Sequence, residues 1–207
     1  MLIMIGMWKT WKSFGNYLKL NTKEEQMNYY NFMKKYWKEP IEGDIQYICD
    51  DFQMSVERIG LGLRGRELVA KMPPRSGKSH IFSIMSVPWA WTKYPHLKFL
   101  MATYDRRLAE KFAHEAKLIM DSPEYKEQFG DILDEGNSLA SLTNKYGGER
   151  HAIGKEITSR GVDMVICDDL TLQQDAVGRA QDWFDMVART RSTRGALWLI
   201  DEQIQIG

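Results

Sequence analysis

The chain has 207 residues, which is enough for one α/β domain with its own hydrophobic core. Its 28 basic and 28 acidic residues give a formal net charge of zero, which argues against a dedicated, strongly basic nucleic-acid-binding module but not against a protein that grips nucleic acid within a larger assembly. No apolar run in the sequence is long enough to span a membrane.

Two helices are predicted ahead of the first strand. Thr22 and Glu25 form a capping-box pattern that begins the first helix, and Pro40 marks its end. Helical spacing places four apolar residues in one stripe, interpreted as core packing, with a partner-binding face as the alternative: Met27, Tyr30, Met33 and Trp37. A second helix is predicted over about residues 45–59.

Short apolar runs predict four buried strands, at residues 67–72, 98–103, 164–167 and 196–200. Helices are predicted between them: one from Ile81 that Pro88 kinks or ends, one capped by Asp105, one that starts at Ser122-Pro123, and one over 183–190. Residues 130–150 are rich in glycine and polar side chains, which is typical of a loop or hairpin. Strands that alternate with helices indicate an α/β fold with a mainly parallel central sheet and helices on both faces.

Residues 72–79 read Met-Pro-Pro-Arg-Ser-Gly-Lys-Ser and lie between a predicted strand and a predicted helix. A loop that binds a phosphate chain needs inward-pointing backbone N–H groups, a lysine, and a hydroxyl group for magnesium. Gly77, Lys78 and Ser79 match the informative half of this P-loop pattern. The leading glycine is replaced by methionine and two prolines remove N–H donors, so the amides from Arg75 to Ser79 must hold the phosphates.

A magnesium ion prefers oxygen ligands, so a phosphate site of this kind also needs a carboxylate. Asp168 ends the third predicted strand and is placed to hold the ion next to Ser79. Asp169 is placed to orient or deprotonate the attacking water. A pair of solvated acids that caps a turn is the plainer alternative, and Asp201-Glu202 at the end of the fourth predicted strand form a rival acidic pair.

The loop belongs to a longer pattern of short matches, at residues 72–79, 102–105, 108–109, 122–125, 129–130 and 157–163, the last leading into Asp168-Asp169. This pattern resembles the ATPase (motor) domain of the large terminase subunits of tailed bacteriophages. In one branch of that family the loop reads Met-Pro-Pro-Arg-His-Gly-Lys-Ser, which differs from this chain at one position. The order and spacing cover more than half of the chain and are more specific than a P-loop alone.

The resemblance implies a P-loop NTPase of the additional-strand, RecA-like type that acts as a Mg²⁺-dependent ATPase. It assigns Lys78 to the β and γ phosphates, Asp168 together with Ser79 to the magnesium ion, and Asp169 to the catalytic carboxylate position, and it favours this acidic pair over the rival pair. Arg75 and Arg160 become candidates for an arginine that stabilises charge at the γ-phosphate, with ordinary surface ion pairs as the alternative. The implied nucleotide-binding set is Pro74, Arg75, Ser76, Gly77, Lys78 and Ser79.

The resemblance also implies ATP hydrolysis that powers the translocation of viral double-stranded DNA into the procapsid. The implied partners are DNA, the portal protein, the small terminase subunit and further copies in a homo-oligomeric ring, with a monomer expected for the isolated chain. The implied location is the host cell cytoplasm, docked on the procapsid and away from membranes. The free cysteines Cys49 and Cys167, which lack metal-ligand neighbours, fit a reducing setting of this kind.

The predicted domains are an N-terminal helical segment over residues 1–62, which packs on the motor, and a P-loop ATPase core over 63–207. The nuclease domain that follows the motor in large terminases is expected to be absent from these residues, and Gln203 stands where the family has a coupling threonine. Two other functions stay open: a helicase-like DNA-dependent ATPase, and a nucleotide-binding scaffold without turnover, which the altered front of the loop favours.

Overall fold

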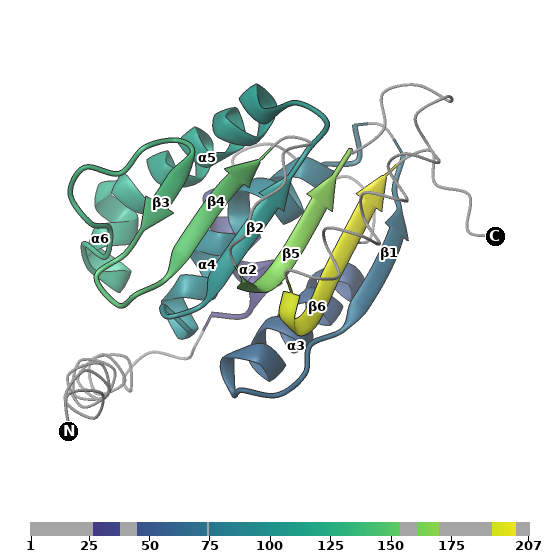
Figure 1. Ribbon diagram of the computed structural model, residues 1–207. Coiled ribbons are helices and arrows are strands. Elements are labelled where there is room, and N and C mark those ends of the chain that lie inside the picture. Colours follow the sequence, from purple (N-terminus) through teal and green to yellow (C-terminus); the bar gives the residue numbers. More distant parts are fainter. Residues whose placement is uncertain (1–26, 38–44, 74, 154–160, 170–191, 202–207) are drawn as a thin grey trace.

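The computed structural model describes residues 27–37, 45–73, 75–153, 161–169 and 192–201 (Figure 1). They form a six-stranded sheet in the order β1-β6-β5-β2-β4-β3. The strands are β1 (Glu67–Lys71), β2 (Lys98–Ala102), β3 (Ser141–Thr143), β4 (Glu149–Ile153), β5 (Val162–Asp168) and β6 (Ser192–Asp201). All neighbours are parallel except β3 and β4, so the predicted α/β class with a mainly parallel sheet is confirmed.

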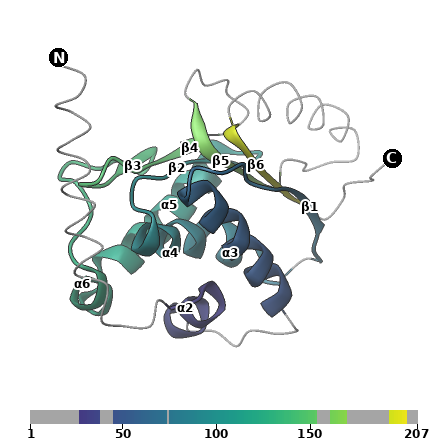
Figure 2. The same cartoon turned by 90° about the horizontal axis from the view of Figure 1, so that it is seen from below.

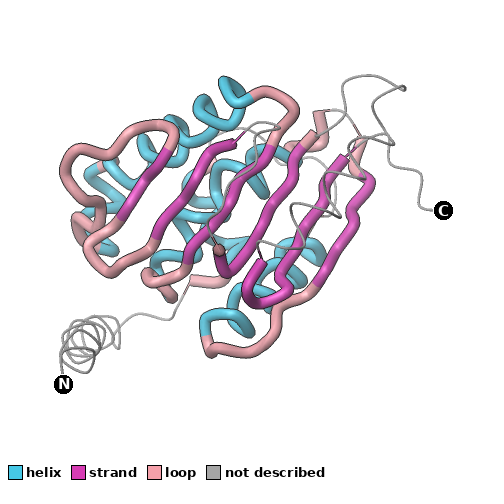
Figure 3. The backbone as a smooth tube through the Cα atoms, in the orientation of Figure 1, coloured by secondary structure: helices cyan, strands magenta, loops and turns pink. Residues whose placement is uncertain are grey.

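The last described strand, β6, lies inside the sheet, between β1 and β5. Leu68 of β1 and Ile166 of β5 both pair with Trp198 of β6. Because these strands are parallel, their carboxyl ends share one edge of the sheet, where α/β proteins place their ligand sites; the arrowheads in Figure 1 mark this edge, and Figure 3 shows the same view as a tube. At this edge β1 leads into the loop 72–79 and β5 ends in Asp168, so one intervening strand separates the loop from the acidic pair.

The described helices all lie on one face of the sheet (Figure 2). They are α2 (Tyr29–Tyr36), α3 (Gln46–Gly60), the π-helix η1 (His80–Met85), α4 (Ser86–Lys93), α5 (Arg106–Asp121) and α6 (Pro123–Phe129). The helix predicted over 183–190 lies outside the described residues, so the expected cover of the other face stays a prediction. None of the helices in the described ranges is long and apolar enough to cross a lipid bilayer.

Aromatic side chains from α2, α3, α4, η1 and β6 meet in one hydrophobic core. Phe52 lies at its centre, with ring centroids 4.9 Å from Tyr29, 5.3 Å from Trp198 and 6.0 Å from Phe82. Burial of each aromatic side chain of this size stabilises a fold by roughly 2–3 kcal/mol. Helices α2 and α3 therefore pack on the sheet through the same core, while the predicted domain boundary at 62/63 stays a prediction.

The first described helix differs from its sequence-based prediction. Asn28 caps α2 by accepting a hydrogen bond from the N–H of Asn31, whereas Thr22 lies outside the described residues. The buried face of α2 consists of Tyr29, Phe32 and Met33. Met33 of the predicted stripe belongs to the core, and the other three stripe residues are half-buried and pack against it, so the interpretation as core packing is confirmed. A shift of one residue rotates a helical stripe by about 100° (3.6 residues per turn), which explains how the pattern could suggest the adjacent face.

Two helix starts and one proline can be compared with the predictions directly. Asp105 and Ser122 cap α5 and α6 as predicted, because each side chain accepts a backbone N–H of the first turn. Pro88 does not end its helix. The chain is instead π-helical over η1 and becomes α-helical from Ser86, so Pro88 lies in the first turn of α4 and the helix continues to Lys93.

Strand β3 lies in the segment 130–150 that was predicted to form a loop or hairpin, and β4 begins at the end of that segment and continues to Ile153. They do form an antiparallel pair, but β4 also pairs in parallel with β2 and extends the main sheet. The four predicted strands thus became six in the structure. Both cysteines, Cys49 and Cys167, are buried and free.

Candidate phosphate and metal site

The loop after β1 turns at two residues with positive φ, Arg75 (φ 61°) and Gly77 (φ 79°). The N–H of Ser76 bonds back to the carbonyl of Pro73, and the N–H of Ile81 bonds to the carbonyl of Gly77. Helical hydrogen bonding thus begins within the loop. The amides that precede Ile81 are therefore at the N-terminal end of a helix, where an anion is favoured.

Gly77 is required for two separate reasons. Its φ is one that residues with a Cβ rarely adopt, and a Cβ added there would lie 2.2 Å from the ring of Trp37. Trp37 follows α2 and stacks on His80, with parallel rings and centroids 5.0 Å apart. An aromatic side chain from the N-terminal helices thus packs directly on the loop.

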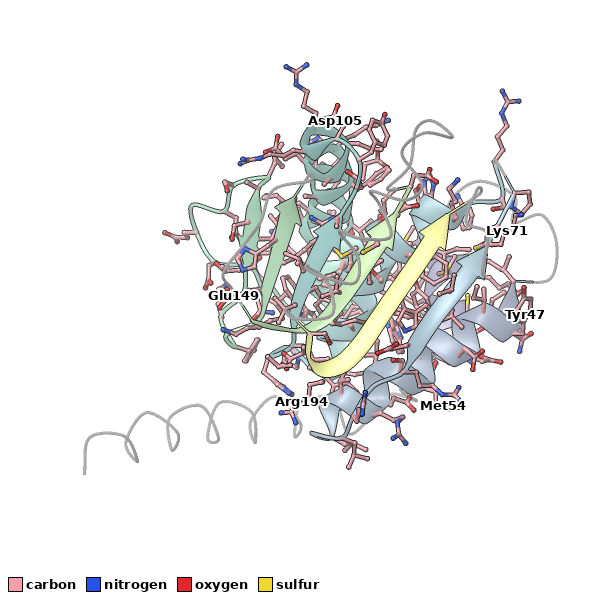
Figure 4. All side chains as sticks on the ribbon, turned by 45° about the vertical axis from the view of Figure 1, so that its right-hand side comes forward. Tyr47, Met54, Lys71, Asp105, Glu149 and Arg194 are labelled. Atoms are coloured by element: carbon pink, nitrogen blue, oxygen red, sulfur yellow. The ribbon has the colours of Figure 1, made fainter. Side chains whose placement is uncertain are left out.

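Lys78 crosses from the loop to the acidic pair. Its ammonium group is 2.9 Å from a carboxylate oxygen of Asp169, and its side chain is 7% exposed. Asp169 has a positive φ (49°), and its carbonyl accepts the N–H of Tyr104, which follows β2. Lys71 and Asp105, which flank this region, lie toward the carboxyl ends of the parallel strands, whereas Arg194 lies at the opposite edge (Figure 4).

Asp168 is buried, with 1% of its surface exposed. Its Oδ2 atom accepts a hydrogen bond of 2.8 Å from the hydroxyl group of Ser83, and its Oδ1 atom has no hydrogen-bond partner in the described part of the chain. Burial raises the pKa of this carboxyl to about 6, although the hydroxyl groups of Ser79 and Ser83 oppose the rise. A buried carboxylate with an unsatisfied oxygen is the chemistry expected of a ligand for a hard cation.

The oxygen atoms of Asp168 and Ser79 are too few to hold a cation by themselves, but they fit a Mg²⁺ ion that is bound together with phosphate. No group of three or more His, Cys, Asp or Glu side chains that could hold a metal occurs among the described residues. Mg²⁺ commonly takes one or two carboxylates and completes its shell with phosphate oxygens and water. Asp168 and the hydroxyl group of Ser79 could supply the protein share of such a shell, because Ser79, at the start of η1, acts directly on the carboxyl group of Asp168 at the end of β5.

The structure brings Lys78, Ser79, Asp168 and Asp169 together, as the sequence predicts. Arg75 is exposed on the loop, and Pro74, Arg160, Glu202 and Gln203 lie outside the described residues. The backbone of Asp201 pairs with that of Lys71. The structure does not describe the side chain of Asp201, so the choice of Asp168 over Asp201 as the magnesium ligand stays a prediction.

Three residues of this region were not predicted from the sequence. Trp37 packs on Gly77 of the loop, the hydroxyl group of Ser83 donates to Asp168, and Arg150 donates to the carbonyl of Ser83. A signal for Ser83 exists in the sequence. It follows Ser79 by four residues, a spacing that places both hydroxyl groups on one side of a helix. Trp37 and Arg150 come from distant segments and carry no such signal.

Of the comparisons with known proteins, the one with solved structures gives a match, and it supports the fold alone. No protein-family model matches the chain, and neither does any curated protein sequence. Among solved structures, the chain is similar to the large terminase of bacteriophage HK97, with a TM-score of 0.56 and 15% sequence identity. The match covers 86% of this chain and 38% of that protein, so the chain spans well under half of its length. The fold is therefore terminase-like.

Proposed function

We propose that the chain is a Mg²⁺-dependent ATPase of the P-loop class and the motor domain of a DNA-packaging terminase large subunit. The observation that carries the proposal is the meeting of Lys78 with Asp169 at the carboxyl edge of a parallel sheet. The insertion of β6 between β1 and β5 supports the additional-strand type. The likeness to a terminase structure supports the packaging role.

In the proposed reaction the amides from Arg75 to Ser79 and the ammonium group of Lys78 bind the phosphate chain. Mg²⁺ held by Ser79 and Asp168 would neutralise charge on the β and γ phosphates. Asp169 orients a water molecule and accepts its proton as the oxygen attacks the γ-phosphorus. The bond from that phosphorus to the bridging oxygen breaks, which yields ADP and phosphate.

Arg75 and Arg160 are the proposed sources of additional positive charge at the γ-phosphate. Arg75 is exposed within the loop, so it can approach a phosphate in its own site. For Arg160 we propose the site of a neighbouring subunit, which requires a homo-oligomeric ring. Guanidinium groups in this role stabilise charge that develops in the transition state and can raise turnover by orders of magnitude.

The proposed partners are double-stranded DNA, the portal protein, the small terminase subunit and other copies of this chain. The proposed location is the host cell cytoplasm, on the procapsid. These proposals draw on the fold likeness and on the sequence resemblance. A net charge of zero fits a motor that holds DNA through a ring of subunits rather than through one basic surface.

Phosphate release from ATP tests the enzymatic part. Wild type should release phosphate only with Mg²⁺, and Lys78→Ala should lower kcat/KM by at least about 100-fold, because it removes a charge that contacts the transferred group. Lys71→Ala is a matched control, since Lys71 is exposed at the end of β1, just ahead of the loop. Equal rates for wild type and Lys78→Ala would refute the ATPase assignment.

Two further assays separate the proposed motor from its alternatives. A translocating motor should displace the third strand of a triplex on blunt duplex DNA in an ATP-dependent manner. A helicase-like ATPase would instead unwind a tailed duplex. A scaffold would bind nucleotide, detectable by equilibrium dialysis, and show no phosphate release above the Lys78→Ala background.

A further inference from the structure

Side chains hold three consecutive backbone carbonyls of the π-helical region behind the loop. The hydroxyl group of Tyr29 donates to the carbonyl of Ile81, that of Ser86 to Phe82, and Nη2 of Arg150 to Ser83. These three donors come from α2, α4 and β4. The backbone that follows the loop is thus fixed from three directions.

The bond to the Ser83 carbonyl has a clear local reason. In π-helical geometry this carbonyl would accept the N–H of the residue five positions on, which is Pro88 and has no N–H. Nη2 of Arg150 supplies a donor from 3.2 Å. The Arg150 side chain is completely buried, and its Nε and Nη1 atoms have no hydrogen-bond partner in the described ranges. The bond to the Ser83 carbonyl is therefore the hydrogen bond that the described residues provide for this guanidinium group.

The side chain of Ser83 points the other way, to the candidate site. Ser83 is 2% exposed, and its hydroxyl group donates to Oδ2 of Asp168 over 2.8 Å, whereas Oδ1 of that carboxylate has no hydrogen-bond partner among the described residues. A hydrogen bond to one oxygen restricts the rotation of a carboxylate about its last bond. Ser83 therefore links a buried arginine of β4 to the acid at the end of β5.

We propose that Ser83 is a positioning residue that holds Asp168 with its Oδ1 atom presented to the metal ion, and that Arg150 fixes the backbone from which Ser83 acts. The inference rests on the proposed function, in which Asp168 is a ligand of Mg²⁺. It adds a second layer to that site: Ser83 touches the ligand, and Arg150 touches Ser83. Outer-layer partners of this kind change metal affinity about 10- to 100-fold when they are removed.

The chain offers a matched control for Ser83. Ser86 is also a buried serine, three residues further on, but its hydroxyl group bonds to a backbone carbonyl and not to Asp168. The test is a titration of the full chain with Mn²⁺ in the presence of ADP, followed by electron paramagnetic resonance of the free ion. This measures metal binding without turnover, and Mg²⁺ half-activation of phosphate release is measured beside it.

Ser83→Ala should raise the half-saturating Mn²⁺ concentration on the order of tenfold, the loss expected for one hydrogen bond to a charged group. Ser86→Ala should stay within about twofold of wild type, since the hydroxyl group of Ser86 bonds to the Phe82 carbonyl and to neither Asp168 nor Ser83. Ser83→Thr, which keeps the hydroxyl group, should restore binding. Ser83→Cys fills nearly the same space with a weak donor and should behave like Ser83→Ala, which keeps the test valid if the alanine variant folds poorly.

Arg150→Met should weaken Mn²⁺ binding in the same direction as Ser83→Ala, and Arg150→Lys, which keeps a donor, should recover part of it. The double variant with Ser83→Ala should bind metal about as well as Ser83→Ala alone, because Arg150 acts through Ser83. A Ser83→Ala variant that matches Ser86→Ala in metal binding overturns the inference. A wild type that shows no nucleotide-dependent metal binding instead overturns the proposed function, and these two failures are distinguishable.

Discussion

Replacing Asp168 by asparagine tests whether the carboxylate at the candidate site weakens the fold that carries it. Asp168 is buried, one of its oxygens accepts a single hydrogen bond from Ser83, and the other has no partner among the described residues. Burial penalises the charged form and raises the pKa from its ordinary value of 3.8 to about 6. Asparagine has nearly the same shape and no charge, so Asp168→Asn should be more stable than wild type.

The size of the effect follows from the pKa. A rise from 3.8 to about 6 means that the folded chain disfavours the ionised carboxylate by about 3 kcal/mol. Because the folded pKa is the higher one, the folded chain binds the proton more tightly, and the penalty is absent below about pH 3.8. It grows as pH rises and is complete above about pH 6. The gain of Asp168→Asn should therefore be about 3 kcal/mol at about pH 8 and about half of that at about pH 5.

The measurement is urea unfolding of wild type and variant at both pH values, with EDTA present so that no cation offsets the charge. Asp50→Asn is the control, since Asp50 is exposed on α3 and the change removes the same charge. Comparison of the two variants at each pH cancels the titration of all other groups. A gain from Asp168→Asn that does not widen between the two pH values, or a loss of stability at both, would refute the reasoning.

Three further predictions have expected outcomes that thermal or urea unfolding can check. Gly77→Ala should cost clearly more than the roughly 1–2 kcal/mol of a positive φ, because its Cβ would also meet Trp37. Gly136→Ala, at nearly the same φ with open space around it, should cost only the backbone part, and equal losses would contradict the Trp37 contact. Asp105→Ala should cost about 1 kcal/mol through loss of the α5 cap. Trp198→Ala should cost about 3–5 kcal/mol, whereas Trp198→Phe should cost less than half as much, since the buried indole N–H has no hydrogen-bond partner in the described part of the chain.

The apolar strands could be predicted from the sequence, and β4 could not. Strands β2 and β5 are continuous buried runs, the pattern expected of a parallel sheet covered on its faces. Strand β4 reads Glu-Arg-His-Ala-Ile, with its first three side chains polar. It forms because β2 on one side and β3 on the other satisfy its backbone, and its core-facing side chain is Arg150, whose burial no hydropathy pattern would suggest.

The candidate site divides in the same way. The loop and the acidic pair are local patterns, each readable within a few residues of a strand end. The contacts that complete the site join distant segments: Ser83 and Asp168 are 85 positions apart, and Arg150 and Ser83 are 67 apart. Such pairs depend on the strand order and on the π-helical geometry of η1, neither of which a single sequence states.

The position of β6 explains why Lys78 is the residue that connects the loop to the acids. Neighbouring strands lie about 4.8 Å apart, so β1 and β5 are separated by roughly twice that distance. The long side chain of Lys78 spans this space to Asp169, whereas the shorter side chain of Ser79 acts on Asp168. A phosphate group that enters the same space competes with Asp169 for the ammonium group. In the proposed reaction, nucleotide binding therefore weakens the hold of Lys78 on the carboxylate that must then accept a proton from water.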